Sequence, residues 1–363
     1  MPGHDTADDG SRRATILKSL LAVLVVAGIF LGVLPRIADM GEVWGHVRDL
    51  TAGEVAALVG VNAWNLVTYW FVAIAALPGP RLAQAGVVNL SSTAVANTVP
   101  AGGGVGVAVT TAMLRSWGYT TAEVGRYVVV TGIWNNFVKL GMPIVALALL
   151  AITGGATTSL VGVAVLGVIG LVVAVVVLGL IVRSEALARR IGAVGGKVGT
   201  WVKKLVRKPP VEDAADRAAR FREDSTELLA TRWHWLTLAT IVGHVALFLV
   251  LLVTLRVVGV DADQLTWIEA LAGFAFARLL TAVPLTPGAV GMIELGYVGA
   301  FVTLGAERSL AVAAVLVFRA FTWLLPIPLG GLTYVVWRRN TDWQDDAHDD
   351  EADGADDAAA VPV

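Results

Sequence analysis

Long apolar stretches separated by short polar segments recur along the chain, and this pattern predicts an all-α membrane protein. A helix needs about 20 apolar residues to cross the hydrocarbon core of a bilayer. Six stretches have roughly this length or more, and each is predicted to cross once: 16–34, 55–77, 127–150, 159–182, 235–258 and 309–337. The chain is 56% hydrophobic with a mean hydropathy of +0.73, which also favours a membrane protein over a soluble one.

Two further apolar segments contain prolines and glycines that spanning helices usually avoid, and we predict that both are re-entrant hairpins. Segment 88–114 contains "NTVPAGGGVG" and segment 267–305 contains "AVPLTPGAVG". Irregular backbone at membrane depth is tolerated only where protein or a water-filled cavity satisfies it. The turns therefore either border a binding site or are structural kinks, and full crossing of each segment is the alternative. The expected turn residues are Pro100, Gly102, Gly103, Gly104, Pro284, Pro287, Gly288 and Gly291.

The two hairpin segments occupy matching positions, which we interpret as a pseudo-repeat of inverted topology. In each segment a Val-Pro pair precedes a glycine-rich turn, and the next long helix contains a proline that we expect to break it, at Pro143 and Pro326. In transporters with inverted repeats, broken helices meet near the membrane midplane and form the substrate site there. The predicted architecture is therefore six spanning helices and two re-entrant hairpins, with a site between the repeats.

Charged residues are unevenly distributed, and their distribution predicts orientation and organisation. Segment 183–232 holds twelve Arg or Lys, and the last helix ends in Arg338 and Arg339. Positively charged loops stay in the cytoplasm, so we place this linker and both termini on the cytoplasmic side of the cell membrane. The linker either lies on the anionic inner leaflet or is solvated. The predicted parts are a tail, a first membrane half, the linker, a second membrane half and an acidic disordered tail: 1–14, 15–182, 183–232, 233–339 and 340–363.

Four charged residues lie well inside apolar segments, where charge is costly and usually faces a cavity or a partner. Arg278 and Glu294 lie on either side of the second turn. Lys139 and Arg319 lie in the middle of the helices that follow the two hairpins. Their excess of positive charge predicts a binding site for a phosphate or another anionic head group, because arginine can hold such a group in a bidentate fork. In the alternative interpretation, Glu294 only neutralises an arginine so that the hairpin can fold.

Uncharged polar residues in the apolar segments have two interpretations. Asn65, Asn89, Asn97 and Asn135 either line the substrate site or join helices through hydrogen bonds. His244 is alone on an apolar helix, and we interpret it as a hydrogen-bonded packing residue.

Several classes of enzyme lack their characteristic residues in this sequence. The chain has no cysteine, which excludes thiolate metal sites and cysteine nucleophiles. We find no cluster of metal ligands and no serine nucleophile motif, and "GGGVG" lacks the lysine of a phosphate-binding loop. We therefore expect a protein that is not an enzyme and that has no cofactor, no metal and no nucleic-acid partner.

The segment "VPLTPGAVGMIELG" and the helix that follows it resemble the lysylphosphatidylglycerol synthetase transmembrane region, also called the flippase-like domain. The resemblance covers roughly residues 15–340. One family glycine is replaced by Ala289, which should still permit a tight turn. The positions that match the family's motif are Pro284, Pro287, Gly288, Gly291, Glu294 and Arg319. The resemblance implies an integral membrane protein that moves or handles polar lipids. We do not expect the separate aminoacyl-transfer domain of the bifunctional relatives in this chain.

Two functions from different classes remain open. The first is a flippase-like protein that translocates or handles an anionic, aminoacylated or polyprenyl-phosphate lipid. The second is a non-transporting membrane partner or anchor for a separate enzyme that modifies lipids or glycans. In the first case the hairpins should matter most, and in the second case the linker and the C-terminal tail.

Overall fold

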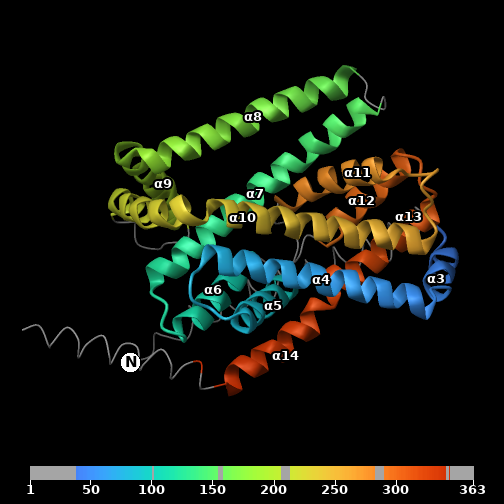
Figure 1. Ribbon diagram of the computed structural model, residues 1–363, viewed down its shortest axis with the longest axis horizontal. Helices are drawn as coiled ribbons and strands as arrows, with labels where there is room; N and C mark the ends of the chain where they lie inside the picture. Colours follow the sequence, from blue (N-terminus) through green and yellow to red (C-terminus); the bar gives the residue numbers. More distant parts are fainter. Residues whose placement is uncertain are drawn as a thin grey trace, which may run out of the picture. The chain divides into compact units, whose positions relative to one another are not determined.

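A computed structural model of the protein describes most of the chain, and its regular secondary structure is entirely helical within that part (Figure 1). The described residues are 38–99, 102–153, 158–205, 213–282, 290–340 and 343. The predicted N-terminal tail, the first predicted crossing and most of the C-terminal tail lie outside them. Four of the predicted turn residues also lie outside them: Pro100, Pro284, Pro287 and Gly288.

Twelve α-helices, with two short irregular helical turns, make up the described residues. Over the first part of the chain they are α3 (Met40–Arg48), α4 (Ala52–Ala76), α5 (Leu82–Thr98), α6 (Gly102–Arg115), α7 (Thr121–Ile152), α8 (Thr158–Arg183) and α9 (Glu185–Leu205). The second part contains α10 (Ala214–Val258), α11 (Trp267–Leu279), the 3-10 turn η2 (Leu280–Ala282), α12 (Met292–Thr303), α13 (Arg308–Arg319), the π-helical turn η4 (Ala320–Leu324) and α14 (Pro326–Arg339).

Four helical segments are long and apolar enough to cross a membrane, and they coincide with four of the predicted crossings. They are Ala52–Ala76, Thr121–Ile152, Leu228–Val258 and Arg308–Arg339. Helix α8 occupies the predicted crossing at 159–182. Its stretch Val165–Leu180 meets the same requirement only together with Glu185–Lys197, from which it is bent by 106°. The described residues thus contain four candidate spans, or five with this bent pair, and the total of six remains a prediction.

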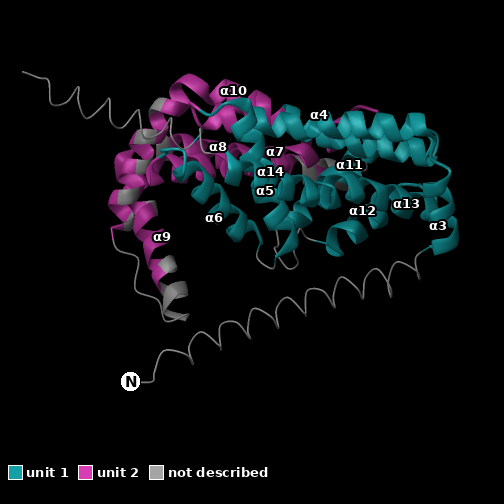
Figure 2. Cartoon of the chain, turned by 90° about the horizontal axis from the view of Figure 1, so that it is seen from below, with its two compact units in different colours: residues 1–71, 80–119, 242–363 teal, residues 72–79, 120–241 magenta. Residues whose placement is uncertain are grey.

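The chain forms two compact units whose segments alternate along the sequence (Figure 2). Unit 1 comprises residues 1–71, 80–119 and 242–363, and unit 2 comprises residues 72–79 and 120–241. Helices α4 and α10 each contribute residues to both units. Both hairpin segments belong to unit 1.

The first hairpin consists of α5 and α6, which pack against each other through small residues. A Cβ atom at Gly102 would lie only 2.1 Å from the backbone oxygen of Ala96, and one at Gly106 would lie 2.9 Å from that of Ser92. Gly103 faces open space. Glycines 102–104 therefore form the first turn of helix α6 rather than the connecting turn, and the first and last glycines of the run 102–106 set the helix spacing.

Helix α5 also packs against α14, so that it is held from two sides (Figure 1). A Cβ atom at Gly330 would lie 2.2 Å from the backbone oxygen of Leu90. At this contact the hydroxyl of Ser91 donates to the Gly330 carbonyl at 3.3 Å and forms a hydrogen bond of 2.9 Å with the Thr333 hydroxyl. Close backbone approach and interhelical hydroxyl bonds are the usual means of packing helices in a membrane, where burial of apolar surface gives little driving force.

The second hairpin consists of α11 and α12, which also pack through glycines. A Cβ atom at Gly273 would lie 2.6 Å from the ring of Phe301, and one at Gly296 would lie 2.5 Å from a terminal methyl of Leu280. The buried ring of Tyr297 stacks near Phe301, at 5.9 Å between ring centroids. Here glycine makes room for large side chains rather than for another backbone.

The order of elements around the two hairpins is the same. A long helix, a glycine with positive φ, a hairpin, a second such glycine and another helix follow one another twice. Positive φ is strained for residues with a Cβ atom, so glycine is the natural residue at these chain reversals. The four glycines are Gly79, Gly118, Gly259 and Gly305, with φ of 109°, 84°, 105° and 116°. The repeat in element order is present, while its inversion across a membrane remains a prediction.

The prolines that follow the hairpins act differently, which corrects the expectation that both break their helices. Helix α7 continues through Pro143 from Thr121 to Ile152. A single proline removes one backbone hydrogen bond, which a long helix can tolerate. Pro326 is accompanied by Pro328, and the chain before them forms the π-helical turn η4, in which the Leu325 N–H donates to the Ala320 carbonyl at 2.8 Å.

Unit 2 contains α7, α8, α9 and most of α10, together with the end of α4. A small apolar cluster joins the end of α4, α7 and α10, and its buried members are Ala75, Ala76, Val130 and Leu236. The predicted linker 183–232 includes helix α9 and the beginning of α10. Arg189 on α9 forms ion pairs with Glu185 and with Asp216 on α10, which tie these two helices together.

Candidate functional site

A buried ion pair in unit 1 joins the second hairpin to the next long helix. Arg319 Nε donates to Glu294 Oε1 at 2.6 Å. The side chain of Glu294 is 1% exposed and that of Arg319 is 12% exposed. An unpaired buried charge is strongly destabilising, so the two residues compensate each other. The pair attaches the start of α12 to the end of α13.

Glu294 also caps the start of α12. Its Oε2 accepts the backbone N–H of Gly291 at 2.5 Å. Gly291 is the N-cap residue of the helix and has a φ of 90°. A carboxylate near the first turn of a helix is stabilised by the free N–H groups and the positive end of the helix dipole. Glu294 therefore fixes the backbone at the end of the hairpin connection as well as the position of Arg319.

Arg278 lies at the end of α11 and has a different environment. Its Nη2 is 3.4 Å from Nε2 of His244, which is 1% exposed on α10. Its guanidinium carbon is 5.7 Å from the ring centre of Phe274, close enough for a cation–π contact. Its Nε is buried and has no hydrogen-bond partner among the described residues. Among the described residues, Nε of Arg278 thus remains available as a donor, whereas Nε of Arg319 donates to Glu294.

A cavity of about 250 Å³ lies next to these arginines, entirely within unit 1. Its walls come from α4, α5, α10, α11, α12, α13, η4 and α14. The polar lining residues are Asn65, Tyr69, Asn89, Thr93, Arg278, Tyr297, Arg319 and Thr322. The apolar lining residues are Leu66, Leu90, Leu247, Ile293, Phe318 and Pro326. Glu294 is not among them, so the charge that faces the cavity is positive.

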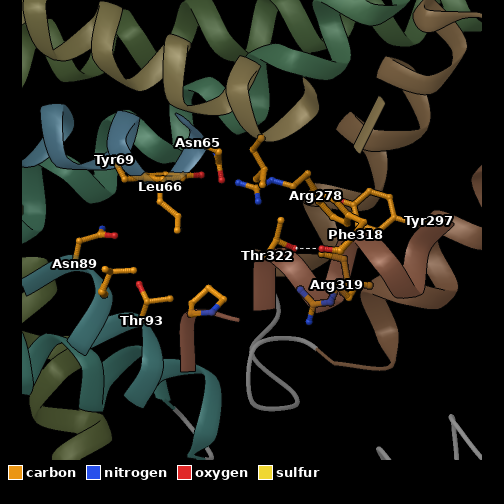
Figure 3. Close-up of a pocket in the computed structure, with 14 residues that line it drawn as sticks. Asn65, Leu66, Tyr69, Asn89, Thr93, Arg278, Tyr297, Phe318, Arg319 and Thr322 are labelled. Atoms are coloured by element: carbon orange, nitrogen blue, oxygen red, sulfur yellow. Dashed lines mark hydrogen bonds between the residues drawn. The ribbon is translucent and has the colours of Figure 1, made fainter. Parts of the chain in front are cut away.

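The cavity has a neutral polar side and a cationic side (Figure 3). Tyr69, Asn89 and Thr93 extend from α4 and α5, and Arg278 and Arg319 lie opposite them. The guanidinium group of Arg278 points toward Asn65, whose Nδ2 donates to the Gly243 carbonyl at 3.3 Å. An anion bound between these sides would meet arginine donors first and neutral hydrogen-bonding groups beyond them.

The predicted site residues fall into three groups. Arg278, Glu294 and Arg319 are brought together at the cavity or directly behind its wall. Asn97 Nδ2 donates to the Trp323 carbonyl at 3.0 Å, which joins α5 to the π-helical turn and agrees with the helix-joining interpretation. Lys139 and Asn135 are half-buried on α7 in unit 2, and their part in a site remains a prediction.

Asn65 and Asn89, for which the sequence left two interpretations open, line the cavity, whereas Tyr69 and Thr93 were not selected from the sequence. Asn65 with Tyr69 on α4 and Asn89 with Thr93 on α5 are each four positions apart, so each pair occupies one helix face. Polar residues at that spacing in an apolar helix are a detectable signal. His244 was expected to be a packing residue. Its contact with Arg278 could not be predicted from the sequence, because the contact depends on how α10 packs against α11. Among the described residues, no group of three or more His, Asp or Glu residues is arranged to hold a metal ion.

The apolar helices together with a buried ion pair define a multi-pass integral membrane protein. Residues 19–330 match the family model described as the lysylphosphatidylglycerol synthase TM region. The chain therefore belongs to this family, as the "VPLTPGAVGMIELG" motif indicated. The matched model covers the membrane region of the family. Comparison with curated proteins gives no match to this chain.

Proposed function

We propose that this protein translocates or handles a polar lipid at the cell membrane and that the cavity of unit 1 receives the lipid head group. The observation that carries the proposal is a cavity among apolar helices that is lined by two arginines and by neutral polar side chains. Charged groups are costly at membrane depth and usually serve a substrate pathway. Arginine forks bind phosphate oxygens well, which suits the phosphate of a lipid head group.

The size of the cavity supports a head group rather than a whole lipid. Its volume of about 250 Å³ lies just below the roughly 300–1,000 Å³ range of small-molecule sites. The acyl chains of the lipid would stay in the bilayer. The family description makes phosphatidylglycerol and its aminoacylated form the first lipids to test, with polyprenyl phosphates as a third class.

A reconstituted translocation assay tests the proposal. Purified protein in liposomes would be given labelled phosphatidylglycerol, aminoacylated phosphatidylglycerol or a polyprenyl phosphate, and movement between leaflets would be measured. We expect one class to move with wild-type protein and to stop moving with Arg278→Ala. Arg308→Ala is the matched control, because Arg308 is exposed at the start of α13 and does not line the cavity.

The alternative function is a non-transporting partner or anchor for an enzyme that modifies lipids or glycans. The ion pairs of Arg189 with Glu185 and Asp216 favour it, because they give the linker helices a defined charged surface. If folded protein moves no lipid of any class, the transport proposal is wrong. Stable capture of such an enzyme, lost when residues 185–232 are replaced by a flexible linker, would then support the partner role.

A further inference from the structure

The two arginines of the cavity are not equivalent. Arg319 is bonded to Glu294 at 2.6 Å, and the pair has no net charge. Arg278 has no carboxylate partner among the described residues, and its hydrogen-bonded neighbour in the structure is the His244 imidazole. Two arginines against one glutamate leave a single positive charge, and it resides on Arg278.

The contact with Arg278 also determines which nitrogen of the His244 ring can carry a proton. Arginine can only donate hydrogen bonds, so Nε2 of His244 must accept, and a ring nitrogen that accepts carries no proton. A histidine of this kind is a neutral imidazole. His244 therefore orients the guanidinium group of Arg278 without neutralising its charge, and it acts as a positioning residue.

We infer that Arg278, oriented by His244, is the anion-binding group of the cavity and selects a head group with one net negative charge, namely a phosphodiester whose substituent is uncharged and hydroxylated. This inference rests on the function proposed above. The remaining donors of Arg278 contact the phosphodiester oxygens. Asn89 and Thr93 offer neutral partners for hydroxyl groups on the opposite side.

The same lining disfavours a head group that carries an added amine. An ammonium group needs a carboxylate or several acceptors to replace its water, and the residues that line the cavity include two arginines and no Asp or Glu. The carboxylate of Glu294, which lies behind the cavity wall, is 1% exposed and engaged with Arg319 and Gly291. Lysylphosphatidylglycerol, whose head group has a net positive charge, should therefore bind about tenfold or more weakly than phosphatidylglycerol.

The test measures binding and translocation separately on the same purified full-length protein. Short-chain fluorescent phosphatidylglycerol, lysylphosphatidylglycerol and phosphatidylcholine would be titrated into protein in zwitterionic nanodiscs, and the same lipids would be followed in proteoliposomes. Soluble glycerophosphoglycerol, which carries the same singly charged phosphodiester, would serve as a competitor. We expect it to displace the lipid only weakly, and equal affinity for the soluble and lipid forms would overturn the assignment to a lipid.

A series of variants changes the cavity charge in known steps. Arg278→Gln removes the single net charge, whereas the double variant Glu294→Gln/Arg319→Gln keeps it. We expect Arg278→Gln to weaken phosphatidylglycerol binding about tenfold or more and to abolish the preference over lysylphosphatidylglycerol. The double variant should retain the preference, and so should the exposed control Arg308→Gln. If selectivity follows Arg319 instead of Arg278, the inference is wrong.

A second pair of variants tests whether His244 positions Arg278 or only fills space in the packing. His244→Gln keeps an acceptor near Arg278, and His244→Leu removes it. We expect His244→Leu to lose selectivity and His244→Gln to keep most of it, at equal thermal stability. Equal behaviour of these two variants would overturn the positioning role.

The outcomes also separate this inference from the function on which it rests. Equal translocation of phosphatidylglycerol and lysylphosphatidylglycerol would overturn the selectivity and leave lipid transport intact. Failure to move any lipid would overturn the transport function, and the binding titrations would still decide whether Arg278 selects a monoanionic head group.

Discussion

The two hairpins of unit 1 share their packing but differ in their charge. In α5 and α6, glycine lets two backbones approach each other, and the interhelical bonds, such as that of Ser91 with Thr333, are neutral. In α11 and α12, glycine makes room for the large side chain of Phe301, and a buried ion pair anchors the hairpin to α13. One element order therefore supports both a neutral, closely packed wall and a charged wall of the same cavity.

The largest loss of stability should come from breaking the ion pair of the second hairpin. Arg319→Ala leaves the carboxylate of Glu294 buried without its charged partner, which typically costs about 3–5 kcal/mol. The double variant Glu294→Gln/Arg319→Gln should recover most of this loss because no charge remains buried. Thermal unfolding in detergent measures the stability of the single and the double variant. A single variant as stable as the wild type would show that the pair is not important for stability.

Removal of an interhelical hydrogen bond in the first hairpin should cost less stability. Ser91→Ala removes a neutral hydroxyl that bonds Gly330 and Thr333, and such a bond contributes about 0.5–1.5 kcal/mol. The same unfolding experiment compares the two hairpins directly. A loss for Ser91→Ala equal to that for Arg319→Ala would remove the distinction between a neutral and a charged wall.

Substitution of the packing glycines should also distinguish the two hairpins by the loss of stability. Gly102→Ala places a Cβ atom against the Ala96 backbone oxygen, which cannot move independently of its helix, and we expect a cost of about 1–3 kcal/mol. Gly103→Ala is the matched control, because its Cβ atom would meet nothing within 4 Å. Comparable losses of unfolding temperature for both variants would contradict the close contact of α5 and α6.

A packing glycine of the second hairpin, Gly296, should tolerate alanine better. The Cβ atom of Gly296→Ala would meet a terminal methyl of Leu280, and a flexible side chain can rotate away. The higher helix propensity of alanine, by up to about 1 kcal/mol, offsets the remaining strain. We expect a change of unfolding temperature well below that of Gly102→Ala, and a larger one would show that Leu280 is fixed in place.

Much of the fold could be predicted because length and apolarity determine which segments cross a membrane. Helices appear at all five predicted crossings that fall within the described residues, and Arg278, Glu294 and Arg319 lie close together as their positions suggested. The continuity of α7 through Pro143 depends on how the rest of the helix compensates for one lost hydrogen bond. The pairing of His244 with Arg278 joins different helices, and a single sequence carries no signal of such a contact.

The helices that follow the two hairpins also begin differently, and this difference predicts a small effect of pH. Helix α7 begins with the mutual hydrogen bonds of Thr120 and Glu123, whereas α13 begins with Glu307, which lies just outside the candidate span. Burial alone would raise the pKa of Glu307. Hydrogen bonds from Ser309 and the backbone, with the nearby His46, outweigh burial and lower this pKa.

A carboxylate whose pKa is lower in the folded state stabilises the fold fully at pH values above its unfolded pKa of about 4.3. This contribution is lost as the pH falls through the folded pKa. We therefore expect the start of α13 to loosen in acid, by a small amount because Glu307 is exposed. Hydrogen exchange of the Ser309 and Leu310 amides should accelerate below that pH relative to the amides at the start of α7. The acceleration should disappear in Glu307→Gln, and its persistence there would assign it to another group.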